Sequence, residues 1–177
     1  YKGIPVQKIN AAISTIDASQ VLCGKKILIT GGSKGIGYQI AKRYIAEGAE
    51  VVIVGRNEET LSHTAQELGC QHIAYNLTNI QDLPSLIKQS ADLLGGLNGS
   101  VNNAGVCNID DGFLKVTENS YDEQFTLNVK SPFFLTQAFV QYCVDHDVES
   151  AGIVFITSER GLYPDDAVLQ KSEMLVS

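Results

Sequence analysis

The sequence predicts an α/β fold, a doubly wound parallel sheet (Rossmann fold) in three α/β/α layers. Apolar runs suited to buried strands alternate with stretches whose apolar residues recur at helical spacing. The strands are apolar throughout instead of alternating, which is typical of a parallel sheet covered on both faces. Glycine-rich or polar segments follow the strands. Since right-handed crossovers bring the carboxyl ends of all strands to one edge, we expect a ligand crevice there.

The stretch Ile27–Gly37 is the most informative part of the chain. An apolar run meets three glycines, Gly31, Gly35 and Gly37, and a helix is predicted directly afterwards over Tyr38–Glu47. A strand, a glycine turn and a helix place unpaired N–H groups and a positive helix end against a phosphate. The spacing is G-x-x-x-G-x-G, not the usual dinucleotide G-x-G-x-x-G. The alternative interpretation is an ordinary turn between a strand and a helix.

The remaining elements continue the alternation. Further strands are predicted at Ala49–Val54, His72–Tyr75, Leu97–Val101 and Ile153–Ile156, and further helices before Gly69 and at Asp82–Leu94, Glu118–Val129 and Pro132–Val144. Ser131-Pro132 is expected to divide the last two helical segments. Residues 1–21 lack a clear period and are interpreted as an N-terminal extension, and residues 22–177 as the dinucleotide-binding domain.

Length and composition exclude several function classes. A chain of 177 residues suffices for one domain with a full core. The net charge of −7 argues against binding to nucleic acid or an anionic membrane. No apolar run is long enough to cross a bilayer, and the start does not resemble a signal peptide. The four cysteines are far apart, which predicts no metal site and no disulfides but mostly buried free thiols. We therefore expect a cytoplasmic protein.

Four motifs in order resemble the classical short-chain dehydrogenase/reductase family. Thr30–Gly37 matches its T-G-x-x-x-G-x-G, and Asn102–Gly105 matches its N-N-A-G. Asn128 matches the helix asparagine of the family's catalytic tetrad, and Ser158 the catalytic serine after the fifth strand. The resemblance covers Leu22 to about Gly161. It implies a cofactor site made by Gly31, Ser33, Lys34, Gly35, Ile36, Gly37, Arg56, Asn76, Leu77, Asn103, Ala104, Gly105 and Lys171.

The residues near the second strand indicate which cofactor is preferred. NAD-preferring sites carry an acidic residue at the end of this strand for the ribose 2′-hydroxyl. This chain has Gly55-Arg56 there, and Lys34 inside the glycine loop. Two cations favour a 2′-phosphate, so we expect NADP(H) in preference to NAD(H). The alternative is that both are solvated surface charges. Asn76 stands where the family usually has Asp near the adenine, and its carbonyl can still accept a hydrogen bond.

The catalytic pattern is incomplete. The family uses a Tyr as acid or base, and a Lys four residues later lowers its pKa by charge. Lys171 resembles that Lys, but Ala167 stands four residues before it. If the usual interval after Ser158 is kept, Lys171 itself falls at the Tyr position. The nearest phenol, Tyr163, has no Lys four residues beyond it.

Two explanations are open for the missing Tyr and for the length of the chain, which ends at Ser177 and is much shorter than a family member. The chain is a truncated or degenerate form, or residues including the Tyr are omitted from it between Tyr163 and Lys171. We favour omission, because segments that cover a substrate belong to the least stable parts of a fold.

Two function classes follow. The first is an NADP(H)-dependent oxidoreductase that acts on a small carbonyl or alcohol substrate. Within the family, the chain resembles the NADP(H)-dependent members that are similar to 3-oxoacyl reductases. The alternative is a non-catalytic dinucleotide-binding protein, either a sensor or an assembly subunit. A serine hydrolase is disfavoured, because Ser158 lacks nucleophile-elbow glycines.

The two helical segments before the fifth strand predict self-association. They carry more aromatic side chains than one sheet face requires: Tyr121, Phe125, Phe133, Phe134, Phe139 and Tyr142. We therefore expect a homodimer or homotetramer. The alternative is that all six face the sheet.

Overall fold

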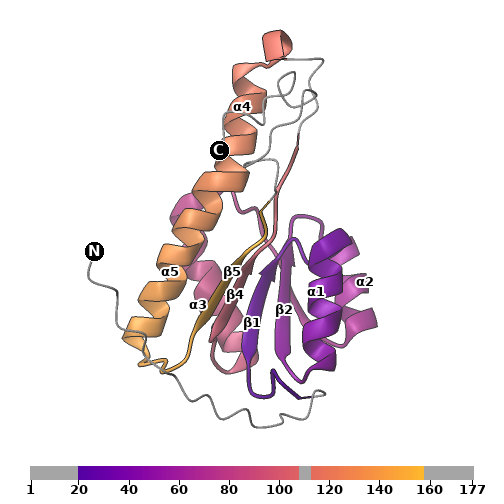
Figure 1. Ribbon diagram of the computed structural model, residues 1–177, viewed down its shortest axis with the longest axis vertical. Helices are drawn as coiled ribbons and strands as arrows, with labels where there is room; N and C mark the ends of the chain where they lie inside the picture. Colours follow the sequence, from indigo (N-terminus) through magenta and orange to yellow (C-terminus); the bar gives the residue numbers. More distant parts are fainter. Residues whose placement is uncertain (1–19, 108–112, 158–177) are drawn as a thin grey trace, which may run out of the picture.

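The computed structural model describes residues 20–107 and 113–157, and it confirms the predicted fold class (Figure 1). Five strands form one parallel sheet in the order β3-β2-β1-β4-β5. The strands are β1 Lys26–Thr30, β2 Glu50–Gly55, β3 Gln71–Ala74, β4 Gly99–Asn102 and β5 Gly152–Phe155. The α-helices are α1 Gly35–Ala46, α2 Glu58–Leu68, α3 Leu83–Leu94, α4 Glu118–Phe125 and α5 Ser131–Asp145. Short 3₁₀ turns cover Ile80–Asp82 and Phe113–Lys115.

The strand order creates a switch point between β1 and β4. From β1 the chain moves outward to β2 and β3, and it then crosses back to β4 on the other side of β1. Connections that leave in opposite directions open a crevice at the carboxyl ends of these two strands. The two motifs that follow them, Gly31–Gly37 and Asn103–Gly105, therefore meet at this crevice.

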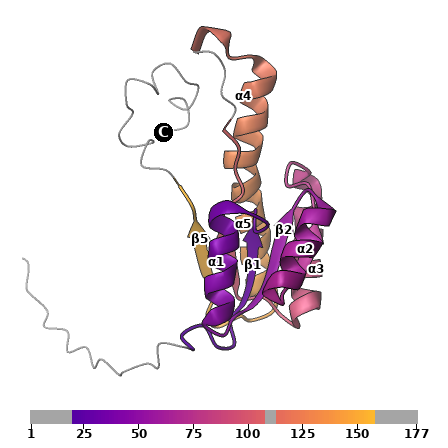
Figure 2. The same cartoon turned by 90° about the vertical axis from the view of Figure 1, so that its right-hand side faces the viewer.

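Two layers of helices cover the central strands (Figure 2). On one face α1 and α2 pack on the strands through the buried side chains Ile27, Ile29, Ala41, Val51, Ile53, Leu61, Ala65 and Val101. On the other face α3 and α5 pack through Leu28, Val52, Val54, Leu83, Leu86, Ile87, Leu135 and Phe139, among others. β1 and β2 are apolar on both sides because both sides are covered, as the sequence predicts.

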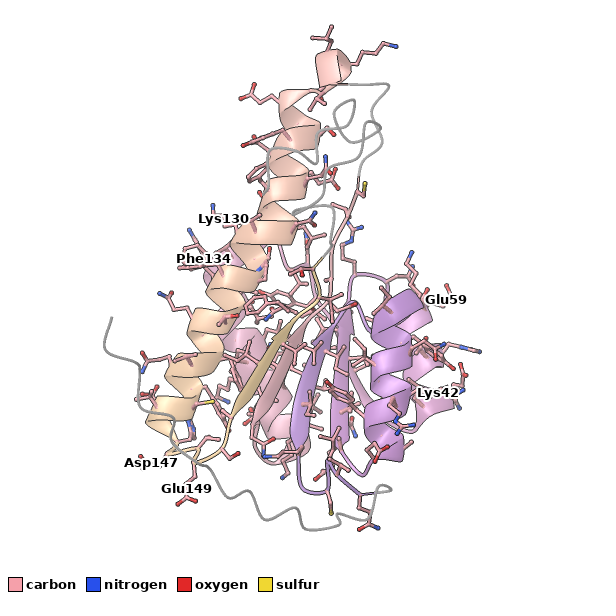
Figure 3. The ribbon with its side chains drawn as sticks, in the orientation of Figure 1. Lys42, Glu59, Lys130, Phe134, Asp147 and Glu149 are labelled. Carbon is pink, nitrogen blue, oxygen red and sulfur yellow. The ribbon has the colours of Figure 1, made fainter. Side chains whose placement is uncertain are left out.

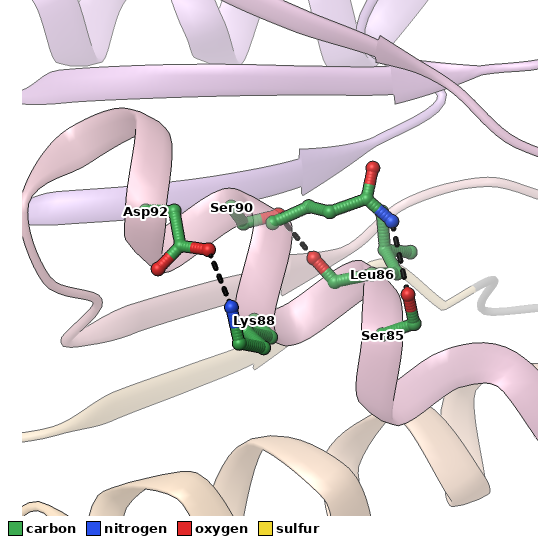
Figure 4. Close-up of polar contacts among 6 residues, drawn as sticks. Ser85, Leu86, Lys88, Ser90 and Asp92 are labelled. Atoms are coloured by element: carbon green, nitrogen blue, oxygen red, sulfur yellow. Dashed lines mark hydrogen bonds and ion pairs between the residues drawn. The ribbon is translucent and has the colours of Figure 1, made fainter.

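Helix α3 shows how one helix divides its faces between core and solvent (Figure 4). Ser90 is fully buried against the core, and its hydroxyl donates to the Leu86 carbonyl at 2.8 Å. This bond within the helix satisfies the Ser90 hydroxyl, which is surrounded by apolar side chains of the core. On the exposed face, Lys88 pairs with Asp92 at 2.8 Å. The pair is solvent-exposed, so it contributes little to the stability of the fold.

The predicted break at Ser131-Pro132 is wrong. The helix axis continues from α4 into α5 through a π-helical segment, Thr126–Lys130, and the combined rod extends beyond the carboxyl ends of the strands (Figures 1 and 3). Pro132 lies in the first turn of α5, directly after the π-helical segment, where the backbone hydrogen-bond register changes. The Ser131 hydroxyl lies 2.7 Å from the Thr126 carbonyl, which also accepts from the Ser131 N–H, and 2.8 Å from the Leu77 carbonyl, so it links the π-helical segment to the turn after β3.

Two further expectations are corrected. The described residues leave the side chains Ile153, Val154 and Phe155 of β5, the edge strand of the described sheet, 37–49% exposed, so they cover this strand less fully than the sequence predicts. The cysteine side chains are not mostly buried, as the sequence predicts they should be. Cys23 and Cys107 are exposed, since both lie in turns or loops at the rim of the sheet.

Candidate functional site

The glycine loop after β1 adopts a conformation that only glycines allow. Gly31 and Gly35 have φ angles of +66° and +58°, in the left-handed region that favours glycine. Gly37 is constrained by space: a Cβ there would lie 2.3 Å from the Gly31 carbonyl oxygen and 2.4 Å from the Asn103 amide nitrogen. The loop is therefore folded tightly on itself, and the backbone at its outer side stays accessible.

Helix α1 begins inside this loop, three residues earlier than predicted, and no side chain caps it. Its N-cap residue is Lys34, with extended φ and ψ and no side-chain hydrogen bond, whereas Asn57 caps α2 by accepting from Thr60 N–H at 2.8 Å. The first-turn N–H groups of a helix have no acceptor within it, and the helix end is positive. An uncapped end beside a lysine is suited to an anion such as a pyrophosphate.

Thr30 and Asn103 join the glycine loop to the segment after β4. The buried Thr30 hydroxyl accepts from the N–H groups of Asn103 and Ala104, both at 3.0 Å, and lies 3.3 Å from the Val101 carbonyl. The Asn103 amide donates to the carbonyls of Thr30 at 2.9 Å and Gly31 at 3.2 Å. These bonds fix the two walls of the crevice relative to each other.

Asn128 holds the far end of the same segment. It lies in the π-helical segment, and its amide forms a two-way clamp on Val106, accepting from the N–H at 2.9 Å and donating to the carbonyl at 2.7 Å. A Cβ on Gly105 would lie 3.3 Å from the Asn128 oxygen, so the clamp fits closely around a glycine. π-Helical insertions often mark functional sites because they redirect one side chain. Here the Asn128 side chain fixes the backbone at Val106, in the loop after β4.

The ends of β2 and β3 form the other half of the crevice. Arg56 follows Gly55 at the end of β2 and is exposed, as is Lys34 after β1. Neither cation has an ion pair or hydrogen bond with the described residues. The nearby carboxylate Glu58 lies 3.0 Å from the His72 ring nitrogen, which draws it toward β3. Two exposed positive charges without a partner in 20–107 and 113–157 therefore follow the ends of the neighbouring strands β1 and β2.

After β3 the chain makes a tight turn over residues 75–79. The Asn76 side-chain oxygen accepts from the Thr78 N–H at 3.2 Å and the Thr78 hydroxyl at 3.0 Å. The Tyr75 hydroxyl donates to the Asn79 carbonyl at 3.1 Å. Burial, reinforced by the charge of Asp82, raises the pKa of Tyr75 to about 12, so the phenol stays a neutral donor. The turn is thus held at both ends.

Known proteins resemble the chain along most of its length. The family model for short chain dehydrogenase matches residues 25–169. The chain belongs to this family. It is 36% identical over 120 residues to sorbitol dehydrogenase of Cereibacter sphaeroides, covering 66% of this chain and 46% of that protein. It is 28% identical over 151 residues to cis-2,3-dihydrobiphenyl-2,3-diol dehydrogenase of Paraburkholderia xenovorans, covering 81% and 53%.

Solved structures of short-chain dehydrogenases have the same fold. A short-chain type dehydrogenase/reductase from Mycobacterium marinum matches with a TM-score of 0.79 at 27% identity, covering 87% of this chain and 63% of that one. A short chain dehydrogenase from Burkholderia cenocepacia, solved in complex with NADP, matches with a TM-score of 0.72 at 28% identity, covering 82% and 60%. The chain spans about half the length of the curated relatives it matches.

The structure brings most of the residues expected from the family resemblance to one edge. Gly31, Ser33, Lys34, Gly35, Ile36, Gly37, Arg56, Asn76, Asn103, Ala104, Gly105 and Asn128 all follow the carboxyl ends of strands or lie beside them. Ile36 is 62% exposed at the start of α1. Leu77 is buried in the core, so only its backbone can meet a ligand. Ser158 and Lys171 lie outside the described residues, as does the stretch from Tyr163 to Lys171.

Sequence reasoning about this short-chain dehydrogenase missed the residues that support the site. Thr30 was part of the quoted motif, but its role as the joint between β1 and β4 was not foreseen. Thr64 on α2, whose hydroxyl lies 3.2 Å from the Ser33 carbonyl, and Val106, which Asn128 clamps, were not predicted at all. The T-G motif pointed to Thr30. No sequence pattern pointed to Thr64 or Val106, because each is bonded to a residue more than twenty positions away in the sequence.

The described residues show neither a metal centre nor a membrane span. Within 20–107 and 113–157, no three His, Cys, Asp or Glu side chains gather as metal ligands. No helix in these ranges is both long and apolar enough to traverse a bilayer.

Proposed function

We propose that this short-chain dehydrogenase binds NADP(H) and transfers hydride between its nicotinamide and a carbonyl or secondary alcohol. The observation that carries the proposal is the uncapped N-terminus of α1 beside Lys34 and Arg56, two exposed cations with no ion pair in the part of the chain that the structure describes. A dinucleotide fits because the glycine loop leaves backbone, not side chains, against the ligand. The named relatives, which act on polyols and dihydrodiols by their names, support the reaction class.

Each residue has a role in this proposal. The N–H groups at the start of α1 hold the pyrophosphate, and Lys34 with Arg56 hold the 2′-phosphate. Asn103, Ala104 and Gly105 form the wall between cofactor and substrate, and Asn76 and the Leu77 backbone lie near the base. Ser158 orients the substrate oxygen, while Lys171 binds the nicotinamide ribose and Asn128 fixes the loop beside it. The nicotinamide supplies the hydride when it is bound. A 3-oxoacyl thioester is the substrate class that the resemblance favours.

Arg56→Ala is expected to weaken NADPH binding about tenfold or more and to leave NADH binding nearly unchanged. A charge-assisted contact to phosphate contributes about 1.5–3 kcal/mol, and NADH has no 2′-phosphate to lose. Calorimetric titration of both cofactors measures the two affinities. Lys42→Ala is the matched control. Lys42 lies farther along α1, away from the carboxyl ends of the strands, whereas Glu59 lies near that end of the sheet (Figure 3). Equal affinities of the unaltered protein for NADPH and NADH would contradict the proposal.

A second candidate function rests on one residue. Ala167 stands at the position where the resemblance places the catalytic Tyr, which favours a non-catalytic dinucleotide-binding protein. Both functions share the cofactor site, and they differ in whether hydride transfer occurs.

The helix surface supports the proposed dimer or tetramer. The alternative, that all six aromatic residues face the sheet, does not hold, since Phe133 is 62% exposed while Phe139 is fully buried. Val129, Phe133, Val140 and Val144 are 42–67% exposed and fall within a narrow arc of the helix, forming one apolar stripe.

Light scattering at micromolar concentration is expected to show a dimer or tetramer, which Phe133→Glu should convert to a smaller species. A buried carboxylate without a partner is costly at an interface. Leu93→Glu is the control, because Leu93 is exposed on α3, off the stripe. A monomeric unaltered protein would refute self-association.

A further inference from the structure

A buried threonine on α2 holds the backbone of the glycine loop from the side. Helix α2 is capped by Asn57, and from this start Leu61, Thr64 and Ala65 fall on the face that packs on the sheet. Leu61 and Ala65 belong to the apolar layer there, whereas Thr64, 5% exposed, brings a hydroxyl into it. The hydroxyl donates to the Ser33 carbonyl at 3.2 Å. Helix α2 is thus bonded to the loop in which α1 begins.

This hydrogen bond is the only one that joins the backbone of residues 32–34 to another element within 20–107 and 113–157. Before it, the Gly31 N–H donates to the end of β2 at 2.7 Å. After it, α1 begins with no side-chain cap. The orientation of the peptide between Ser33 and Lys34 therefore depends on Thr64.

The peptide between Ser33 and Lys34 is trans, so its C=O and N–H groups point in opposite directions. Because the carbonyl faces Thr64, the Lys34 N–H faces away from α2. Helix α2 packs on β2 and β3, and β4 lies on the opposite side of β1. The Lys34 N–H therefore points to the crevice side of the loop, where it has no acceptor among the residues that the structure describes.

We propose that Thr64 is a positioning residue for the start of α1, an inference that rests on the proposed function. By holding the Ser33 carbonyl on the side of α2, Thr64 keeps the Lys34 N–H directed at the pyrophosphate, together with the first-turn N–H groups of α1. Thr64 acts only through the loop backbone. Its contribution is therefore common to NADPH and NADH, because both carry the pyrophosphate, and differs from that of Arg56.

The test is calorimetric binding of NADPH and NADH by Thr64→Val, in which a methyl group replaces the hydroxyl at nearly equal volume. Both affinities are expected to fall by about tenfold, the lower end of the range for one hydrogen bond to a charged group, while their ratio stays unchanged. Thr64→Ser keeps the hydroxyl and omits the methyl group, and it is expected to retain both affinities. The pair of variants separates the hydrogen bond from packing.

Tyr38→Phe is the matched control, because it also removes a hydrogen bond between α1 and α2. The Tyr38 hydroxyl donates to the Glu67 carboxylate at 2.6 Å. This bond joins two side chains and leaves the Ser33 peptide in place, so both affinities are expected to stay unchanged. An equal loss in Tyr38→Phe would refute the inference, since any loosening of the two helices would then suffice. Unchanged affinities in Thr64→Val, or a loss confined to NADPH, would also refute it and leave the proposed function in place.

Hydrogen exchange of the unaltered protein tests the peptide orientation without a substitution, and so covers the case in which Thr64→Val does not fold. The Lys34 amide is expected to exchange rapidly without ligand and about tenfold or more slowly with NADPH bound. An exchange rate that bound NADPH does not change would overturn the inference. Failure of the unaltered protein to bind either dinucleotide would overturn the proposed function and the inference with it.

Discussion

Gly37→Ala is expected to weaken NADPH binding by roughly 10²–10⁴-fold. The new methyl group would lie 2.3 Å from the Gly31 carbonyl oxygen and 2.4 Å from the Asn103 amide nitrogen, closer than any real contact. The start of α1 must then move away from the loop, and its N–H groups no longer converge on a phosphate. Losing two charge-assisted hydrogen bonds costs about 3–6 kcal/mol, which corresponds to the stated loss.

Calorimetric titration measures the affinity, and thermal unfolding monitors the fold at the same time. Gly152→Ala is the matched control, since Gly152 has no atom within 4 Å of the position of a new Cβ and an ordinary φ. Its NADPH affinity is expected to equal that of the unaltered protein. If Gly37→Ala folds and retains full affinity, the glycine loop does not hold the pyrophosphate.

Ala167→Tyr is expected to raise the rate of ketone reduction by about 10²–10⁴-fold, the usual contribution of a positioned acid or base. The substitution creates Tyr-x-x-x-Lys with Lys171, whose charge lowers the phenol pKa and favours its ionised form. Single-turnover oxidation of bound NADPH is followed against simple ketones and a 3-oxoacyl thioester. The assay uses the protein as it occurs in its cell, so that any segment beyond this chain is present.

Two further variants make the outcome decisive. Ala167→Tyr combined with Lys171→Ala is expected to lose most of the gain, because the phenol is then no longer activated. Tyr163→Phe addresses the other nearby phenol and is expected to leave the rate of the unaltered protein unchanged. If Ala167→Tyr binds NADPH but gains no rate, and the unaltered protein is also inactive toward these ketones, the oxidoreductase proposal fails for this chain and the non-catalytic dinucleotide-binding function is preferred. An unaltered protein that already reduces ketones indicates instead that a Tyr precedes Lys171 in an omitted segment.

The sequence alone determined the fold class, the alternation of strands and helices, and the edge of the sheet that carries the site. These features are local: apolar runs set the strands, and the glycines after Thr30 mark the turn into α1. The motifs also indicated the family, which the comparisons confirm. Helix boundaries were less accurate, because α1 begins within the glycine loop and Pro132 is accommodated in a first turn.

Only the tertiary structure decided how the motifs cooperate. Asn103 donates to Gly31 across seventy-two residues, and Asn128 clamps Val106 across twenty-two. No local pattern encodes such bonds, since they depend on which strands become neighbours and on where a π-helical segment turns a side chain. The orientation of the Asn76 amide is another feature that only the structure decides. The residue type permits a donor or an acceptor toward the ligand, and the N–H of Thr78 leaves only the donor.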